Sequence, residues 1–428
     1  MKVISVADPV AEAAGLRRSA SAISDALLQD ARSIMSGVAE RGDAALADYT
    51  AKFDGAAPGP LRVTRKEVDL AYGAITVAQA KALRLMKKRL EKSERAVMKR
   101  LKRIQISMQG VRIERQLVPV SSVGCYVPGG KARYPSTLVM CAVPAKVAGV
   151  KRIVAISPPR KDGTVDPLTL AAADICGVDE FYKVGGAHGI AALAYGTESI
   201  RPVSKIVGPG GMYVTAAKLV ASSKASTDMV AGPTELLVLA DSTADARTVA
   251  LDLVSQAEHS QDTVCGLVTN SQSLASDVQK ELQSKVEKIE RSDIVRASLE
   301  KNGFIAVCKD APSCVQFANE FAPEHIEVIT RNADAVAKKI RTAGLVLVGA
   351  DTPSSASDYC LGSNHVLPTL GFGKSRASLS VLDFVKLVSR VTATNKGLAK
   401  VGAPIREIAA AEGLPNHYEA VRGRLEKD

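Results

Sequence analysis

From residue 117 onward, short β-rich runs alternate with helical stretches, and this alternation constrains the fold more than any other feature. The expected strands are 152–156, 180–184, 205–207, 236–239, 264–269, 304–307, 327–329 and 345–348. Helices are expected between them, including 167–176, 187–195 and 213–222. A strand that is followed by a helix and then by another strand is typical of parallel sheets. We therefore predict an α/β fold, with two parallel sheets.

The residues before this region are helical in pattern. A helical stretch over 23–53 ends at Asp54 and Gly55, and a second opens near Thr64, where Thr64 and Glu67 have the spacing of a capping box. A chain of 428 residues is too long for one compact core, so two or more domains are expected.

The formal net charge of +11 is concentrated in one segment. Eleven Lys or Arg residues lie between 81 and 103, against only Glu91 and Glu94. The apolar residues of this segment keep a helical period that is interrupted at Glu94. Because no aromatic residues alternate with the basic ones, a solvent-exposed helix face is favoured over a nucleic-acid surface.

The cysteines and the hydropathy of the chain indicate the cellular compartment in which it is expected. The seven cysteines are scattered and include no Cys-x-x-Cys pair, which argues against a disulfide framework and a structural zinc knuckle. The N-terminus lacks the apolar core of a signal peptide, and no run of eighteen apolar residues occurs. We expect a soluble cytoplasmic protein, without a membrane or nucleic-acid partner.

Two glycine-rich turns, 126–131 and 208–211, interrupt the middle of the chain. Neither matches a standard nucleotide-binding fingerprint. The first lacks the leading glycine and the Ser or Thr of a Walker A loop, because Cys125 and Ala132 occupy those places, and the second has Tyr213 where a dinucleotide fold places its third glycine. The second turn lies between an expected strand and a helix N-terminus, where a phosphate would be favoured. An ordinary tight turn is the alternative.

Four of the five histidines lie in the C-terminal two-fifths of the chain, each near an acid or an amide. Gln256 and His259 are three positions apart on an expected helix over 243–260 and can converge on one ligand. A helix cap with a solvent contact is the alternative.

Glu324 and His325 adjoin an expected helix-to-strand turn, where they can serve as two proton-transfer groups or form a surface ion pair. Asp358 and His365 follow in a loop-like stretch that is rich in Ser and Gly. A donor set of Gln, His, Asp and His suits zinc better than calcium.

At this level of detail the chain resembles the histidinol dehydrogenase family from end to end. The matching stretches include Ser255-Gln-Ala-Glu-His259 and Ala322-Pro-Glu-His325. Further matches lie at 40–46, 125–130, 184–187, 191–197, 205–210, 231–235 and 363–368. The resemblance implies oxidation of L-histidinol to L-histidine by two hydride transfers to NAD, through an aldehyde that stays bound.

The resemblance also implies a role for individual residues. It implies one zinc ion per subunit, held by Gln256, His259, Asp358 and His417. It makes His325 the base that takes the alcohol proton and Glu324 the group that activates water. The implied substrate pocket comprises Thr234, Gln256, His259, His325, Asp358, His365, Glu412 and His417.

The fold implied by the resemblance has two Rossmann-like parallel-sheet domains in an aldehyde-dehydrogenase-like architecture, with small helical extensions at both termini. The expected division is an N-terminal extension (1–20), a discontinuous catalytic domain (21–125 and 234–379), a second domain on the coenzyme side (126–233) and a helical tail (380–428). In a homodimer this tail would complete the partner's active site, through Glu412 and His417.

Departures from the family pattern lie mainly at the coenzyme. Of the expected coenzyme-binding residues, Tyr126 is kept, while His188 stands where the family usually has Gln and Gly211 where it usually has Asn. Thr234 replaces the usual Ser and keeps the hydroxyl. A related zinc- and NAD-dependent dehydrogenase of another small polyol or sulfonated alcohol is the first alternative, and a nucleic-acid-binding protein that uses the basic helix is the second.

Overall fold

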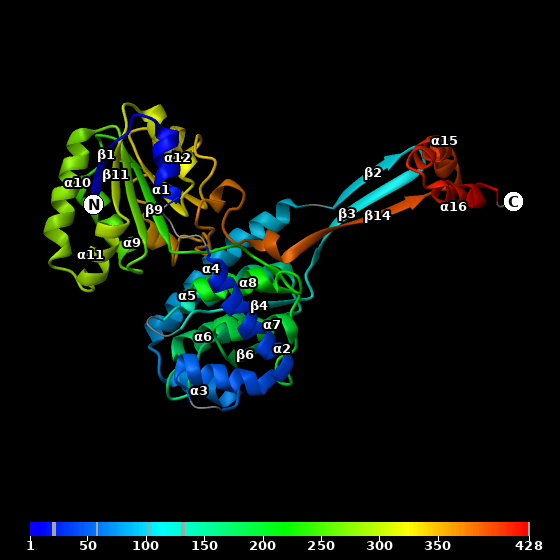
Figure 1. Cartoon of the computed structure of the whole chain (residues 1–428), viewed down its shortest axis with the longest axis horizontal. Helices are drawn as coiled ribbons and strands as arrows, with labels where there is room; N and C mark the ends of the chain where they lie inside the picture. The colour runs from blue at the N-terminus through cyan, green and yellow to red at the C-terminus, as the bar shows by residue number, and fades with distance from the viewer. Residues whose placement is uncertain (19–22, 57–58, 102, 130–132, 427–428) are drawn as a thin grey trace.

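The computed structural model describes residues 1–18, 23–56, 59–101, 103–129 and 133–426. Figure 1 shows two lobes side by side and an arm that projects from between them. Each lobe is built on a parallel sheet, and antiparallel strands form the arm.

The first lobe contains a six-stranded sheet in the order β1-β11-β10-β9-β12-β13, with every described pair parallel. Its strands are β1 (Lys2–Ser5), β9 (Glu235–Ala240), β10 (Val264–Thr269), β11 (Phe304–Val307), β12 (His325–Ile329) and β13 (Leu345–Val348). Its helices are α1 (Pro9–Arg18), α9 (Ala246–Ala257), α10 (Gln272–Val286), α11 (Ser292–Lys301), α12 (Ala311–Phe321), α13 (Ala333–Ala337) and α14 (Ser354–Ser357). Two apolar clusters cover the two faces, one with α9, α10 and α11 and the other with α1 and α12. Both faces are therefore buried, as a parallel sheet requires.

The second lobe contains a five-stranded parallel sheet in the order β6-β5-β4-β7-β8. Its strands are β4 (Ser122–Tyr126), β5 (Arg152–Ser157), β6 (Glu180–Lys183), β7 (Lys205–Val207) and β8 (Ser226–Thr227). Its helices are α2 (Asp25–Asp54), α3 (Arg65–Gly73), α4 (Val77–Arg100), α5 (Pro135–Ala148), α6 (Pro167–Cys176), α7 (Gly186–Tyr195) and α8 (Met212–Ala221). The strand order runs outward from β4 in both directions. Ligands of such sheets bind outside the carboxyl ends of the strands at this reversal, here β4 and β7.

The arm is an antiparallel sheet in the order β14-β3-β2, with two helices at its tip (Figure 1). Its strands are β2 (Ile104–Met108), β3 (Val111–Pro119) and β14 (Val385–Ala393), and its helices are α15 (Asn395–Ala411) and α16 (Pro415–Leu425). The short helices η1 (Phe372–Lys374) and η2 (Val381–Phe384) precede β14.

The predicted α/β class, with two parallel sheets and helices at both termini, is confirmed. The expected strands 205–207, 264–269, 304–307 and 345–348 have the predicted bounds, and the capping box at Thr64 is present. The second glycine-rich turn joins β7 to α8, as predicted. In the first turn, Gly130 and Lys131 lie outside the described residues.

The packing differs from the expected division of the chain. The expected division places residues 21–125 with 234–379, whereas β4 pairs with β5 and β7, and α2 packs against α7 and α8. The supposed N-terminal extension supplies β1 to the first sheet, and the supposed helical tail includes the strand β14. The apolar stripe of a helix shows that it has a buried face but does not say which sheet covers that face.

The structure explains why the apolar pattern of the basic helix α4 is interrupted at Glu94. Glu94 is buried, and its carboxylate accepts a 2.7 Å hydrogen bond from the backbone nitrogen of Val381 at the start of η2. Glu91 pairs with Lys87 and Arg95 on the outer face.

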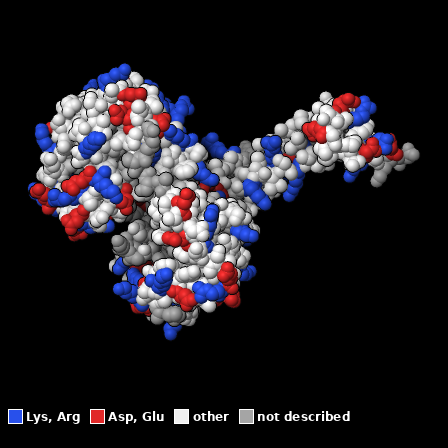
Figure 2. Space-filling view, viewed as in Figure 1, with Lys and Arg blue, Asp and Glu red and all other residues white. Residues whose placement is uncertain are grey.

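Figure 2 shows acidic residues interspersed among the Lys and Arg residues of the visible face. Among the described helices, none is long and apolar enough to cross a membrane.

Candidate active site

The candidate catalytic residues meet where β9 and β12 begin. These strands are parallel neighbours, so Thr234 and Glu324, which directly precede them, lie side by side. The Thr234 hydroxyl donates a 2.5 Å hydrogen bond to Oε2 of Glu324, and the backbone nitrogen of Glu235 donates to the same oxygen at 2.7 Å. The Glu324 carboxylate is thus buried and held by two donors.

The end of helix α9 joins this group through Gln256. The side-chain nitrogen of Gln256 donates to the Thr234 hydroxyl at 2.7 Å, so the amide oxygen is the atom available to a metal. The helix ends at Ala257, earlier than predicted, and His259 lies in the turn that follows. Its Nδ1 is 3.1 Å from the carbonyl oxygen of Gln256. A carbonyl only accepts, so this contact places the proton on Nδ1 and leaves Nε2 as a ligand atom.

His325 lies between two carboxylates. Its Nδ1 is 3.7 Å from Oε2 of Glu324, and its Nε2 is 3.6 Å from Oδ1 of Asp358. The ring is buried, and neither nitrogen has a hydrogen-bond partner in the described part of the chain. Burial by itself lowers the pKa of His325, but the charges of Glu324 and Asp358 outweigh it and raise the pKa to about 10.

Asp358 follows α14 and is surrounded by imidazoles. Burial raises the pKa of its carboxyl, but His325, His365 and His259 together bring that pKa below its usual value. The Nδ1 of His365 lies 2.7 Å from the backbone oxygen of Asp358, which fixes the ring at the edge of the site. Burial lowers the pKa of His365, so the neutral imidazole is favoured there.

The predicted zinc donors come together only in part. Asp358 faces His325, while Gln256 is linked to Glu324 through Thr234 and its carbonyl oxygen contacts His259. His417 and Glu412 are exposed on the helices at the tip of the arm (Figure 1). Within the described residues of one chain, no three His, Cys, Asp or Glu side chains form a group that could hold a metal ion. The chemistry of the Gln, His and Asp side chains suits zinc, and His417, the fourth expected donor, lies apart from the other three in one chain.

Sequence reasoning missed a buried pair that supports Glu324. Glu235 is 1 % exposed, accepts from the backbone nitrogens of Glu324 at 3.3 Å and Leu370 at 2.9 Å, and is paired with Arg17. Burial raises the pKa of Glu235, and the charge of Arg17 opposes that effect. The sequence contains a feature that indicates this pair: Glu235 directly precedes the apolar run Leu236–Ala240, and a glutamate buried there needs a partner.

The expected coenzyme residues Tyr126 and His188 lie at the carboxyl ends of the second sheet. The Tyr126 hydroxyl accepts a 3.3 Å hydrogen bond from the backbone nitrogen of Gly186 at the start of α7. Beside them is a cavity of about 620 Å³, which is lined by α2, by the first residues of α7 and by Tyr213 of α8. This cavity lies at the N-terminal end of α7, which follows β6.

His188 is buried at the wall of this cavity. Its Nε2 is 3.3 Å from the Thr50 hydroxyl and 3.8 Å from Oδ2 of Asp54, and the rings of Tyr49 and Phe53 each lie 6.0 Å from its own. Burial lowers the pKa of His188 to about 4 and raises that of Asp54 to about 6. Both groups are therefore drawn toward their neutral forms.

The second glycine-rich turn holds two very different glycines. Gly208 has a φ of +115°, and a Cβ there would lie 2.1 Å from the backbone oxygen of Tyr126. Gly211 caps α8, and a Cβ there would meet nothing within 4 Å. Close backbone packing therefore requires glycine at 208, while 211 has room for a side chain.

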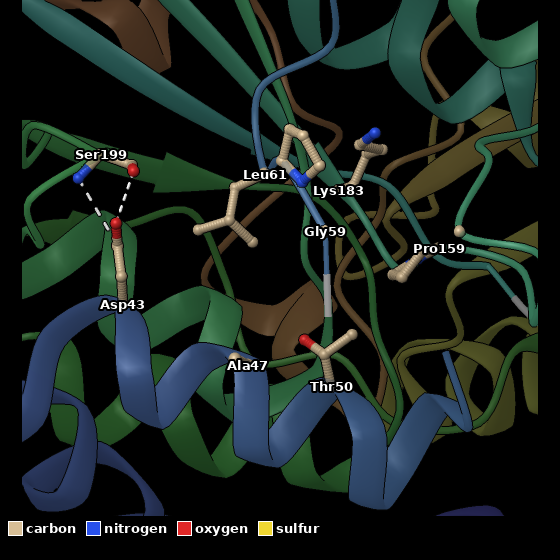
Figure 3. A pocket seen from close by; sticks show the side chains of 10 residues that line it. Asp43, Ala47, Thr50, Gly59, Leu61, Pro159, Lys183 and Ser199 are labelled. Atoms are coloured by element: carbon tan, nitrogen blue, oxygen red, sulfur yellow. Dashed lines mark hydrogen bonds between the residues drawn. The ribbon is translucent and has the colours of Figure 1, made fainter. Parts of the chain in front are cut away.

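A smaller cavity of about 230 Å³ lies on the other side of Thr50 (Figure 3). Asp43 accepts hydrogen bonds from the hydroxyl of Ser199 at 2.5 Å and from its backbone nitrogen at 3.4 Å, and Lys183 also lines this space. Because Thr50 bonds to His188, this residue pair separates the two cavities.

Comparison with known proteins agrees with the fold. The family model for histidinol dehydrogenase matches residues 16–425. The histidinol dehydrogenase of Methanocaldococcus jannaschii is 40% identical over 399 residues, which cover 93% of this chain and 92% of that relative. The one from Geobacillus kaustophilus is 44% identical over 397 residues, with 92% and 93% coverage. The crystal structure of histidinol dehydrogenase from Elizabethkingia anophelis superposes with a TM-score of 0.94 at 33% identity, over 100% of this chain and 98% of that one.

These matches, together with the α/β fold and its two sites, define the chain as an NAD-dependent dehydrogenase. It belongs to the histidinol dehydrogenase family.

Proposed function

We propose that the chain oxidises L-histidinol to L-histidine, the last oxidation of histidine biosynthesis, by two hydride transfers to NAD. The observation that carries this proposal is the buried Glu324–His325 pair beside Thr234, which presents two proton-transfer groups at one place. Similarity to histidinol dehydrogenases over almost the whole chain supports the choice of substrate.

In the first half-reaction, the alcohol gives its hydroxyl proton to His325 and a hydride to NAD. The products are the bound aldehyde, NADH and an imidazolium, which then releases its proton. His325 must start neutral to accept a proton, whereas the carboxylates on both sides of it favour the protonated ring.

Zinc, when bound by Gln256, His259, Asp358 and a fourth donor, would orient the imidazole and amine of the substrate and offset the charge of Asp358. Glu324 and Asp358 both raise the pKa of His325, so offsetting the charge of Asp358 would lower that pKa and favour the neutral ring.

In the second half-reaction, water must first add to the aldehyde. Glu324 takes a proton from this water, and its fixed orientation by Thr234 and Glu235 directs the carboxylate at the reacting carbon. The hydrate then gives a hydride to a second NAD and a proton to His325, which yields the carboxylate, and Glu324 and His325 release their protons to solvent.

The fourth zinc ligand and the rest of the substrate pocket come, in this proposal, from a second copy of the chain. Glu412 and His417 are exposed at the tip of the arm, away from the other site residues of their own chain (Figure 1). A homodimer in which each arm reaches the other copy's site would supply the fourth ligand and complete the substrate pocket. This arrangement accounts for an arm whose strands β2, β3 and β14 leave the two lobes.

The decisive experiment measures NADH formed from L-histidinol, with and without a zinc chelator. We expect two NADH for each substrate molecule consumed, and loss of activity when the metal is removed. One NADH per substrate, or none, would contradict the proposal and favour an enzyme of the same family that acts on another alcohol.

A further inference from the structure

A second pair of buried carboxyl groups lies directly behind the active site. Asp252 and Glu327 are 7 % and 1 % exposed. Asp252 is one turn before Gln256 on α9, so the two project from the same face of the helix. Glu327 is two residues after His325 on β12, so these two share a face of the sheet. None of the proposed steps uses this pair.

Glu327 also holds the helix that leads to Asp358. Its Oε1 accepts a 2.6 Å hydrogen bond from the backbone nitrogen of Ser354, the first residue of α14. Pro353 provides no side-chain cap there, so Glu327 satisfies a donor that the start of a helix otherwise leaves unpaired. Asp358 is the residue that ends this short helix.

The other oxygen of Glu327 lies next to the carboxyl group of Asp252. Its Oε2 is buried and receives no hydrogen bond from the described residues, while Asp252 lies within hydrogen-bonding reach. Two carboxylates this close in a buried space cannot both be ionised. Burial and the charge of Asp252 raise the pKa of Glu327 to about 8, and burial also raises the pKa of Asp252, so both carboxyl groups are drawn toward their protonated forms.

We propose that Asp252 and Glu327 are positioning residues that lock α9, β12 and α14 together and so hold Gln256, His325 and Asp358 at their working distances. Helix α9 carries Asp252 and Gln256, and strand β12 carries Glu327 and His325. Helix α14, which Glu327 holds at its first residue, ends at Asp358. This inference rests on the roles proposed above for those side chains.

The test compares Glu327→Ala with Glu327→Gln in the full-length enzyme. Gln keeps an acceptor for the Ser354 nitrogen and donates to Asp252 without needing a proton, whereas Ala removes both bonds. Zinc affinity is measured by competition with a chelator, and kcat by NADH formation. We expect Glu327→Ala to bind zinc about 10–100-fold more weakly, as supporting partners of metal ligands do when removed, and Glu327→Gln to restore most of that affinity.

Glu94→Ala is the matched control, because Glu94 is also a buried glutamate that accepts one backbone hydrogen bond, at 2.7 Å, but lies on α4. It should lower the melting temperature without changing zinc affinity. Equal zinc affinity in Glu327→Ala and Glu94→Ala would overturn the inference, as would a failure of Glu327→Gln to restore binding.

Two further outcomes are decided in the same experiment. If Glu327→Ala does not fold, Asp252→Ala replaces it and Asp252→Asn serves as the rescuing variant, since Asn can donate to an ionised Glu327; equal zinc affinity in these two variants overturns the inference. If the wild type binds no zinc, the proposed metal role fails, and the positioning role is then tested by comparing the kcat values of the variants. In that case a kcat for Glu327→Ala equal to that of Glu94→Ala overturns it.

Discussion

The Thr234 hydroxyl donates a 2.5 Å hydrogen bond to Oε2 of Glu324 while it accepts one of 2.7 Å from Gln256. One hydroxyl therefore connects a proposed metal ligand to the carboxylate proposed to activate water. A hydroxyl can donate and accept at the same time, so Ser or Thr suits this position and an apolar residue does not.

Replacing Thr234 with Val removes this connection while keeping the shape of the side chain. A hydrogen bond to a charged group contributes about 1.5–3 kcal/mol, and about 1.4 kcal/mol corresponds to tenfold in rate. We expect kcat for NADH formation from L-histidinol to fall at least about tenfold in Thr234→Val. Thr234→Ser keeps the hydroxyl and should stay near the wild type. Equal kcat values in the two variants would show that the hydroxyl does not support Glu324.

The two glycines of the turn after β7 should respond in opposite ways to a side chain. Gly211→Asn adds the residue usual in the family where nothing lies within 4 Å, so the melting temperature should not change. If the new amide reaches NAD, one hydrogen bond of about 0.5–1.5 kcal/mol tightens binding by about two- to tenfold, measured by calorimetry. Gly208→Ala, with its Cβ 2.1 Å from the Tyr126 oxygen, should destabilise the fold. Weaker NAD binding by Gly211→Asn would contradict the coenzyme assignment.

Asp54 and His188 should give the free energy of unfolding opposite pH dependences. His188 has its pKa lowered from 6.5 to about 4, so its stabilising contribution is complete above pH 6.5 and is lost as the pH falls toward 4. Asp54 has its pKa raised from 3.8 to about 6, so its contribution is complete below pH 3.8 and is lost as the pH rises through 6. The wild type combines the two effects, which oppose each other between about pH 4 and 6.

Asp54→Asn should therefore make the protein more sensitive to acid. Between pH 6.5 and 4 it should lose about 1–3 kcal/mol more than the wild type, measured by urea unfolding across that range. His188→Gln removes the opposite contribution, so this variant should become relatively more stable as the pH falls. Parallel pH curves for both variants and the wild type would show that these groups keep their ordinary pKa values in the folded state.

The sequence predicted the strands and the residues of the active site better than it predicted which segments pack together. The runs 264–269 and 304–307 are apolar enough to be recognised as buried strands of a parallel sheet. Glu324 and His325 are neighbours in the chain, so their pairing needed no tertiary information. The placement of α2 on the second sheet did need it, because an amphipathic stripe fits either sheet.

The buried carboxyl groups show the same limit. Glu327 lies two residues after His325 in an apolar strand, and its position alone marks it as unusual. Its partners, Asp252 and the backbone of Ser354, are 75 and 27 residues away in the sequence and become neighbours only when α9 and α14 meet β12. No local pattern encodes contacts of this range.

The separation of His417 from its proposed co-ligands makes the dimer testable by mixing inactive variants. His325→Ala lacks the base and His417→Ala lacks the ligand at the tip of the arm, so each homodimer should be inactive. If arms are exchanged, random reassociation after mild denaturation produces heterodimers with one complete site, so about a quarter of all sites should recover NADH formation. Mixing His325→Ala with Asp358→Ala is the control, because both residues lie in the same lobe and no complete site can form. Recovery in the control, or none in the first mixture, would show that the arm does not serve the partner.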